Sequence, residues 1–354
     1  MSTRSIAVTG LNATDNPGPG VAVLRCLRHE DVDNTRLIGL AYDALDPGIY
    51  ARDLADEVFL MPYPSCSREH FFERLREIHE RAPFDVIVPT LDAEIPVFIE
   101  IEPWLAELGV RALLPTREQL ESRSKRNLQS LARSCGFLTP QSVVVGTRLE
   151  LRELGRQLSY PFFLKGPFYG AKLVKHHEEA AAAFDNIVAE WGFPVIAQAA
   201  VGDAAPEERN VVGLGDGRGR LVAAVAMKKL AVTEKGKGWA GVTIRDPALI
   251  QLAERFVHAT HWGGPFELEV VHSQDLGDHM IEINPRFPAW VYLAAHAGAN
   301  LPKLAVAMAL GQQVEPLAAG EYAVGKMFIR ISLDQTADIR DLERILTTGE
   351  RRGG

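Results

Sequence analysis

Two acidic segments late in the sequence have the residue types and spacing of a cation site. They read GPFELEVV and, after a polar turn, MIEINPRF. Because side chains alternate along a strand, Glu267 and Glu269 share one face, and Glu282 and Asn284 share one face of the next strand. Glu269 and Glu282 can then lie opposite each other among apolar neighbours, which is costly unless a cation neutralises them. Carboxylate and amide oxygens suit magnesium, and a surface ladder of charges is the alternative.

Basic residues placed to meet an anion form a second group. Arg286 ends the MIEINPR run and could reach a terminal phosphate with its planar fork. Lys165 ends the apolar strand pattern SYPFFLK, where a buried lysine needs an anion unless it extends its ammonium into water. Lys228 lies on a predicted strand. Lys235 and Lys237 follow in a glycine-containing loop that either closes over an anion or is solvated.

The composition of the chain excludes several classes of protein. The net charge of −8 over 354 residues argues against a nucleic-acid partner. No run of 18 apolar residues occurs, so we expect no membrane span. The N-terminus enters a strand pattern without a basic and apolar signal region, so we expect a cytoplasmic location. The three cysteines lack metal-ligand spacing and are predicted to be reduced thiols.

The first 115 residues alternate strand and helix signals. Strands that are apolar on both faces, such as residues 5–9 and 84–89, indicate a parallel sheet covered by helices on both sides. Asp92 and Glu94 follow the second of these strands, at the edge where ligands bind in such folds. Helix capping is the alternative role for Asp92.

The pattern changes near Pro115 to antiparallel strands mixed with helices. We predict an α/β domain over residues 1–115 and a small α+β subdomain with a linker helix over 116–200. A C-terminal subdomain with the cation site is predicted over 201–335, where the turn GDGRGR joins two strands and residues 265–284 form a hairpin. The polar tail, residues 336–354, is predicted to be disordered.

The pattern E-x-N-x-R on a late strand, after an acidic strand, resembles the metal site of the ATP-grasp superfamily, which includes biotin carboxylase, carbamoyl-phosphate synthetase and amino-acid ligases. The resemblance covers about residues 5 to 330. It implies a Rossmann-like preATP-grasp domain followed by a two-subdomain ATP-grasp fold. It also implies Glu269 and Glu282 as metal ligands supported by Asn284, with Arg286 near the phosphate and Glu267 as the alternative first ligand.

The same resemblance implies a nucleotide site from earlier segments. Its members contact phosphate with two lysines, cover it with a glycine-rich loop, and lay one strand beside the adenine; an acid near that strand binds the ribose. The matching positions here are Lys125, Lys165, Gln198, Ala199, Val201 and Glu208. Ala199 replaces the acid often found on that strand, so Glu208 is expected either to contact the ribose or to lie on the surface. The loop GPFYGAK has two glycines where many members carry more.

The resemblance implies ATP and Mg²⁺, with Mn²⁺ as a substitute, and a carboxylate–amine ligase that works through an acylphosphate. Lys228 and Arg286 would neutralise charge during phosphoryl transfer. The expected partners are a small-molecule or peptide carboxylate and an amine, and a homodimer is left open. A bicarbonate-using carboxylase or carbamoyl-phosphate-type enzyme and a non-catalytic nucleotide-binding module are the alternatives.

Overall fold

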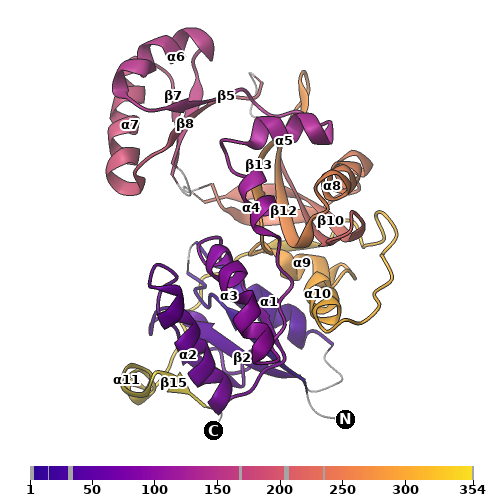
Figure 1. Cartoon of the computed structure of the whole chain (residues 1–354). Helices are drawn as coiled ribbons and strands as arrows, with labels where there is room; N and C mark the ends of the chain where they lie inside the picture. The colour runs from indigo at the N-terminus through magenta and orange to yellow at the C-terminus, as the bar shows by residue number, and fades with distance from the viewer. Residues whose placement is uncertain are drawn as a thin grey trace. The chain divides into compact units, whose positions relative to one another are not determined.

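The computed structural model describes residues 4–14, 16–30, 35–166, 170–202, 207–233 and 236–352. Its contacts divide the chain into two units (Figure 1). Unit 1 comprises Met1–Arg117, Asn210–Glu267 and Asn284–Gly354, and unit 2 comprises Glu118–Arg209 and Leu268–Ile283. Residues 201–335, which we predicted as one subdomain, are therefore divided between the two units.

The N-terminal part of unit 1 is the predicted parallel sheet. It contains β1 (Ser5–Thr9), β2 (Arg36–Ala41), β3 (Glu57–Leu60), β4 (Val86–Val88) and β15 (Glu350–Arg351) in the order β15-β3-β2-β1-β4. Strands β1 to β4 pair in parallel. The helical elements are α1 (Gly20–Arg28), η1 (Pro47–Ile49), α2 (Arg68–Arg81) and α3 (Ile95–Glu107). The mixed α/β class that we predicted is confirmed.

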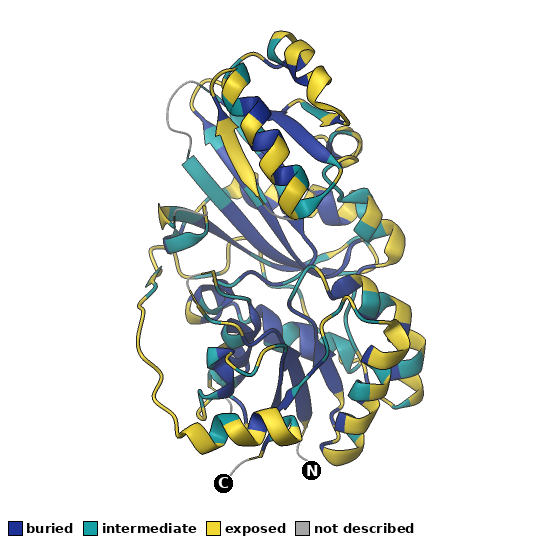
Figure 2. Cartoon of the chain, turned by 90° about the vertical axis from the view of Figure 1, so that its left-hand side faces the viewer, coloured by how far each residue is buried: buried dark blue, intermediate teal, exposed yellow. Residues whose placement is uncertain are grey.

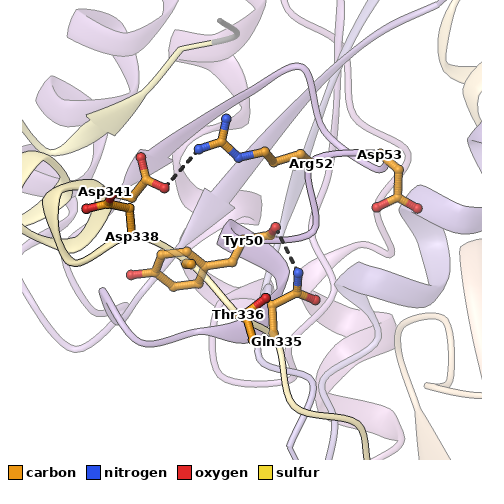
Figure 3. A pocket seen from close by; sticks show the side chains of 8 residues that line it. Tyr50, Arg52, Asp53, Gln335, Thr336, Asp338 and Asp341 are labelled. Atoms are coloured by element: carbon orange, nitrogen blue, oxygen red, sulfur yellow. Dashed lines mark hydrogen bonds and ion pairs between the residues drawn. The ribbon is translucent and has the colours of Figure 1, made fainter.

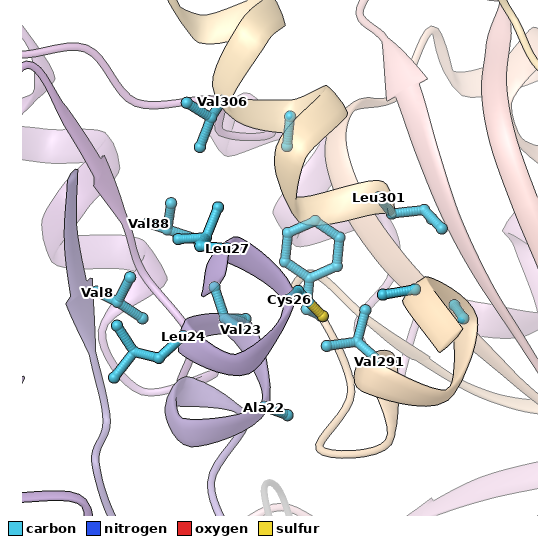
Figure 4. Close-up of a cluster of buried hydrophobic side chains, with 14 of the residues drawn as sticks. Val8, Ala22, Val23, Leu24, Cys26, Leu27, Val88, Val291, Leu301 and Val306 are labelled. Atoms are coloured by element: carbon cyan, nitrogen blue, oxygen red, sulfur yellow. The ribbon is translucent and has the colours of Figure 1, made fainter. Parts of the chain in front are cut away.

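Every residue of β1 is buried because both faces of the sheet are covered. Ala7 packs in a cluster with Phe71 of α2 and Phe98 of α3. Val8 points to the other face, into a cluster with α1 and with residues from the C-terminal part of the unit, such as Val291 and Leu301 (Figure 4). Alternation along one strand thus joins segments nearly 300 residues apart into one core.

The largest sheet has six strands, in the order β13-β12-β9-β10-β11-β14. They are β9 (Glu207–Asp216), β10 (Leu221–Val232), β11 (Gly238–Thr243), β12 (Gly263–Ser273), β13 (Gly277–Asn284) and β14 (Met327–Ile329). The helices α8 (Pro247–Thr260), α9 (Val291–His296) and α10 (Leu301–Ala309) belong to the same part of the chain. The predicted hairpin of β12 and β13 and the predicted turn between β9 and β10 are both present.

Unit 2 contains a four-stranded antiparallel sheet. Its strands are β5 (Ser142–Val145), β6 (Phe162–Lys165), β7 (Ala171–Val174) and β8 (Val195–Ala199), in the order β5-β8-β6-β7. The helical elements are α4 (Arg117–Ser122), α5 (Leu128–Cys135), η2 (Arg148–Glu150), α6 (Leu151–Gln157) and α7 (His177–Trp191). Phe162, Leu164 and Ala197 pack under α6 and α7, so one face of this sheet forms a core.

The C-terminal segment corrects the prediction of a disordered tail, which is wrong for the described residues up to 352. Helix α11 (Ile339–Thr348) is capped by Asp338, whose side chain accepts from the Arg340 N–H, and it buries Ile345. Strand β15 then pairs antiparallel with β3. The segment looked solvated because it is polar, but edge pairing uses backbone groups and does not require apolar side chains.

A surface cavity of ≈ 740 Å³ lies where this segment meets the N-terminal sheet domain (Figure 3). The Gln335 side chain donates to the Tyr50 carbonyl, and the Arg52 guanidinium pairs with Asp341 at 2.8 Å. None of the residues that line the cavity was predicted to do chemistry. Among the described residues, no helix is long and apolar enough to cross a membrane.

Candidate functional site

The sheet of unit 2 carries Lys165 on the face opposite its core. Lys165 pairs with Ile196 of β8, and Phe163 pairs with Gln198. Since Phe162, Leu164 and Ala197 point toward α6 and α7, alternation directs Lys165 and Gln198 to the other face. The Gln198 amide donates to the Ser142 hydroxyl at 3.2 Å, which fixes its side chain.

Lys165 is only 9% exposed, and burial lowers the pKa of its amine. The carboxylates of Glu282, Glu269 and Glu208 oppose this shift, with Glu282 acting most strongly, and Lys125 reinforces it. Four residues chosen from separate parts of the sequence therefore act on this one amine. An ammonium buried to this extent is favourable only where anions surround it.

Lys125 is the second cation of this group. Its Nζ lies 3.6 Å from Glu282 Oε1 and donates to the Gly166 carbonyl at 3.2 Å. The group formed by Lys125, Lys165 and Glu282 joins two cations to one carboxylate, so its net positive charge favours an anion. The predicted loop residues 167–169 lie outside the described part of the chain.

Glu267 is the centre of a hydrogen-bond network within unit 1. Its Oε1 accepts from Asn210 Nδ2 at 2.8 Å and from Trp290 Nε1 at 2.7 Å. Its Oε2 accepts from Asn284 Nδ2 at 2.9 Å and lies 3.4 Å from Arg286 Nη1. The Glu267 carboxylate is 4% exposed, and these four contacts use its ordinary acceptor capacity. Among the described residues, the buried Asn210 Oδ1 finds no hydrogen-bond partner.

Arg286 lies between two carboxylates. Its Nε pairs with Asp92 Oδ2 at 2.7 Å, and its Nη1 donates to the Phe287 carbonyl at 3.3 Å in addition to the contact with Glu267. Both members of the Arg286–Asp92 pair are largely buried, with 12% and 14% of their side chains exposed. Such a pair fixes the plane of the guanidinium. Asp92 therefore acts as an ion-pair partner, which the sequence could not distinguish from helix capping.

The loop that presents Asp92 is held by Glu94. The Glu94 carboxylate is fully buried at the start of α3 and accepts from the hydroxyls of Thr9 and Tyr42 and from the N–H groups of Thr90 and Leu91. Burial is the largest effect on this group and raises its pKa above the usual value. Glu94 thus has a structural role in fixing the loop between β4 and α3.

Three of the remaining predicted residues lie on strands. Lys228 is on β10 opposite Val242 of β11. Ala199 ends β8, and its N–H donates to the Gln141 carbonyl at 2.9 Å. Glu208 is on β9. Val201 is buried. Lys237 lies within the part of the chain that the structure describes, and Lys235 lies outside it. Sequence reasoning missed that Asn210 and Trp290 donate to Glu267.

The donor set fits a hard divalent cation better than a transition metal. The described residues contain no group of three or more His, Cys, Asp or Glu side chains that could hold a metal ion. Mg²⁺ needs only one or two carboxylates, because phosphate and water complete its coordination. Glu269 and Glu282, which both act on Lys165, meet that requirement.

Residues 206–326 match the family described as "ATP-grasp in the biosynthetic pathway with Ter operon". No curated protein matches the sequence. The fold is similar to that of biotin carboxylase from Campylobacter jejuni in complex with β,γ-ATP, with a TM-score of 0.69, 14% identity, and coverage of 92% of this chain and 74% of that chain.

Two further solved structures have the same fold. L-amino acid ligase from Bacillus licheniformis has a TM-score of 0.63 and 17% identity, covering 90% of this chain and 76% of that chain. N5-carboxyaminoimidazole synthetase from Staphylococcus aureus complexed with ADP has a TM-score of 0.67 and 12% identity, covering 88% and 79%. The resemblance that we predicted is confirmed: this chain has the ATP-grasp fold, and its residues 206–326 match an ATP-grasp family.

Proposed function

We propose that this chain is an ADP-forming ligase that uses ATP to activate a carboxylate and then joins it to an amine. The observation that carries the proposal is the buried Lys165 amine, which lies in the electrostatic field of Lys125, Glu282 and Glu269. The proteins of similar fold support the use of ATP, because their structures were solved with an ATP analogue or ADP.

The nucleotide would bind to unit 2 through the residues that share the Lys165 face. Lys125 and Lys165 would contact the phosphates, and the backbone of Gln198, Ala199 and Val201 would contact the adenine. Glu208, which acts on the Lys165 amine, would bind the ribose. Glu282 and Glu269 would hold Mg²⁺, or Mn²⁺ in its place, and the ion would supply neutralisation of phosphate charge. Asn284, on the same strand as Glu282, supports them or binds directly, and Glu267 is the alternative ligand.

The reaction has two steps, and both balance without a side-chain nucleophile. A substrate carboxylate oxygen attacks the γ-phosphorus of ATP, which forms an acylphosphate and releases ADP. An amine then attacks the acyl carbon, an amide bond forms, the C–O bond to phosphate breaks, and the amine loses a proton. Lys228 and Arg286 would stabilise the anionic groups in these steps. The ion pair with Asp92 suits this role because it fixes the direction of the Arg286 fork.

The substrate is proposed to be an amino acid, a peptide or a similar small carboxylate. The L-amino acid ligase among the proteins of similar fold supports this class. Biotin carboxylase and N5-carboxyaminoimidazole synthetase support bicarbonate as the alternative acid. In both cases an oxygen anion is phosphorylated, so the same cations serve and the acid itself must be identified by experiment.

The test is to trap the acylphosphate. Purified protein is incubated with ATP, Mg²⁺ and hydroxylamine across a panel of amino acids, peptides and bicarbonate, and hydroxamates are detected by mass spectrometry alongside ADP. The proposal predicts ADP release and a hydroxamate from a defined carboxylate. ADP release that depends only on bicarbonate would favour the alternative, and tight ATP binding without ADP from any substrate would indicate a non-catalytic module.

Glu282→Ala tests the metal assignment, with Glu343→Ala on the exposed face of α11 as the matched control. We expect Glu282→Ala to abolish ADP formation while the circular dichroism spectrum is unchanged, and Glu343→Ala to behave as the parent. Near-normal turnover of Glu282→Ala would exclude Glu282 as a metal ligand.

A further inference from the structure

Strand β14, which belongs to unit 1, is an edge of the six-stranded sheet, and it begins an exposed apolar stripe that continues into the coil after Ile329. It pairs with β11 on one side and ends the strand order on the other. Met327, Ile329, Ile331 and Leu333 alternate along the chain and are 52%, 63%, 73% and 77% exposed. The coil that continues from this strand toward α11 is exposed along its length (Figure 2). Edges of this kind are unusual in a protein that stays monomeric.

The backbone of β14 has hydrogen-bonding groups directed to the open side. The Arg330 N–H donates to the Trp239 carbonyl of the neighbouring segment, and Phe328 lies opposite Gly241. In an antiparallel ladder, hydrogen-bonded positions alternate with positions whose N–H and C=O point the other way. The backbone groups of Met327 and Ile329 therefore point away from β11.

Three other sheet edges in the described part of the chain, those of β13, β4 and β7, are protected. The Met280 N–H of β13 donates to the Leu138 carbonyl, and Val86 of β4 bridges to Arg111. Strand β7 carries Lys172, and a charged edge resists pairing with another chain. On β14, in contrast, the exposed positions are apolar, so this edge favours association.

We propose that β14 pairs antiparallel with β14 of a second copy of this chain, across a twofold axis at Ile329. In that register Ile329 lies opposite its own copy and Met327 lies opposite Ile331, so the apolar stripe is buried against itself. Phe328 lies opposite Arg330, and the Arg330 guanidinium already lies 5.5 Å from the Phe328 ring within one chain. Aromatic and cationic side chains in cross-strand contact attract each other.

The complementarity of this segment with itself identifies the occupant as a second copy. A twofold interface requires one surface to match itself, and residues 327–331 do so without opposing like charges. Moving the axis by one residue would place Arg330 opposite Arg330, which is unfavourable. A short strand pair buries a small area, so we expect a reversible dimer whose population depends on protein concentration.

Sedimentation velocity of the full chain without nucleotide, over a dilution series, tests this proposal independently of any enzymatic activity. We expect a shift with concentration from the 38.9 kDa chain to a species of twice that mass. Ile329→Lys should remain monomeric at every concentration because it places two ammonium groups at the axis. Leu346→Lys, an equally exposed apolar position on α11, should dimerise as the parent does.

A cross-link provides a second measurement that does not depend on weakening the dimer. Residues opposite each other across an antiparallel pair have Cα atoms about 5.5 Å apart, within the range of a disulfide. Ile329→Cys should therefore form a covalent dimer on mild oxidation, and Leu346→Cys should not. A parent chain that stays monomeric, equal association of Ile329→Lys and the parent, or equal cross-linking of the two cysteine variants would overturn the proposal.

Discussion

Replacing Glu267 with glutamine tests the buried network of unit 1, because the change keeps the shape of the side chain but replaces one acceptor oxygen with an NH₂ group and removes the charge that faces Arg286. Each carboxylate oxygen accepts from two groups. One is an asparagine side chain, Asn210 or Asn284, which can rotate to present its oxygen instead of its NH₂ group. The other is a donor that cannot become an acceptor. The fixed donors are Trp290 Nε1 on one oxygen and Arg286 Nη1 on the other. Whichever way the glutamine amide turns, its NH₂ group faces one of these two donors.

The expected cost follows from that geometry. A buried donor that loses its acceptor costs about 1–3 kcal/mol, and more when the donor is charged. The rotating amides can adapt, so we expect the free energy of unfolding of Glu267→Gln to fall by about 2–4 kcal/mol. Glu254→Gln, an exposed change of the same kind on α8, should stay within about 0.5 kcal/mol of the parent.

Urea unfolding followed by circular dichroism measures these free energies, and a double-mutant cycle with Trp290→Phe identifies the network. Trp290→Phe removes the indole N–H, so in the double variant the glutamine NH₂ can face the ring without opposing a donor. The double variant should therefore be more stable than the sum of the single changes predicts, by about 1–2 kcal/mol. A Glu267→Gln protein as stable as Glu254→Gln, or strictly additive changes, would refute the four-donor arrangement.

Three further outcomes are expected. Lys165→Met should raise the free energy of unfolding at pH 7, because burial of the ammonium outweighs its attraction to Glu282 and Glu269, and isothermal titration calorimetry should show loss of ATP binding. Burial lowers the folded-state pKa of Lys165, so between that pKa and 10.5 the unfolded chain binds more protons than the folded chain. The parent should therefore gain stability relative to Lys165→Met as the pH rises through this range. A stability difference between the two proteins that does not change with pH in urea unfolding would contradict this. Burial raises the folded-state pKa of Glu94. The parent should therefore lose stability relative to Glu94→Gln as the pH rises above about 4.5. Equal pH profiles of the two proteins would show that the folded-state pKa of Glu94 is not raised.

The fold could be predicted well where the sequence repeats a simple period. Strands buried on both faces gave the parallel sheet, and alternating strands with the GDGRGR turn gave the antiparallel part. The tail was mispredicted because α11 buries only Ile345 and β15 docks through its backbone, and neither leaves a strong apolar pattern. The division into units was also not predictable from a local pattern. The core cluster that contains Val8 also contains Val291, which lies far along the chain.

The site was predictable as a set of residue types, while its contacts depend on distances that no local pattern contains. Lys165 was chosen because it ends an apolar strand, and its burial agrees with that reasoning. The pairing of Arg286 with Asp92 joins residues 194 positions apart, and only the assembled fold of unit 1 brings them together. Asn210 carried no signal, since asparagine is mostly exposed and nothing in the sequence marked this one as buried.

The choice between Glu267 and Glu269 depends on the register of β12 and β13. His272 Nδ1 lies 2.7 Å from Asp278 Oδ1, and a regular ladder counted back from that pair would place Glu267 opposite Ile283. Glu267 instead accepts from the side chain of Asn284, and side-chain contacts can join diagonal as well as directly opposite residues. In the register of the Glu267–Asn284 pair, Glu269 lies opposite Glu282. Both of these carboxylates act on the Lys165 amine, which supports that register. In it, Glu267 accepts hydrogen bonds from its own donors, and Glu269 and Glu282 are placed to share a cation.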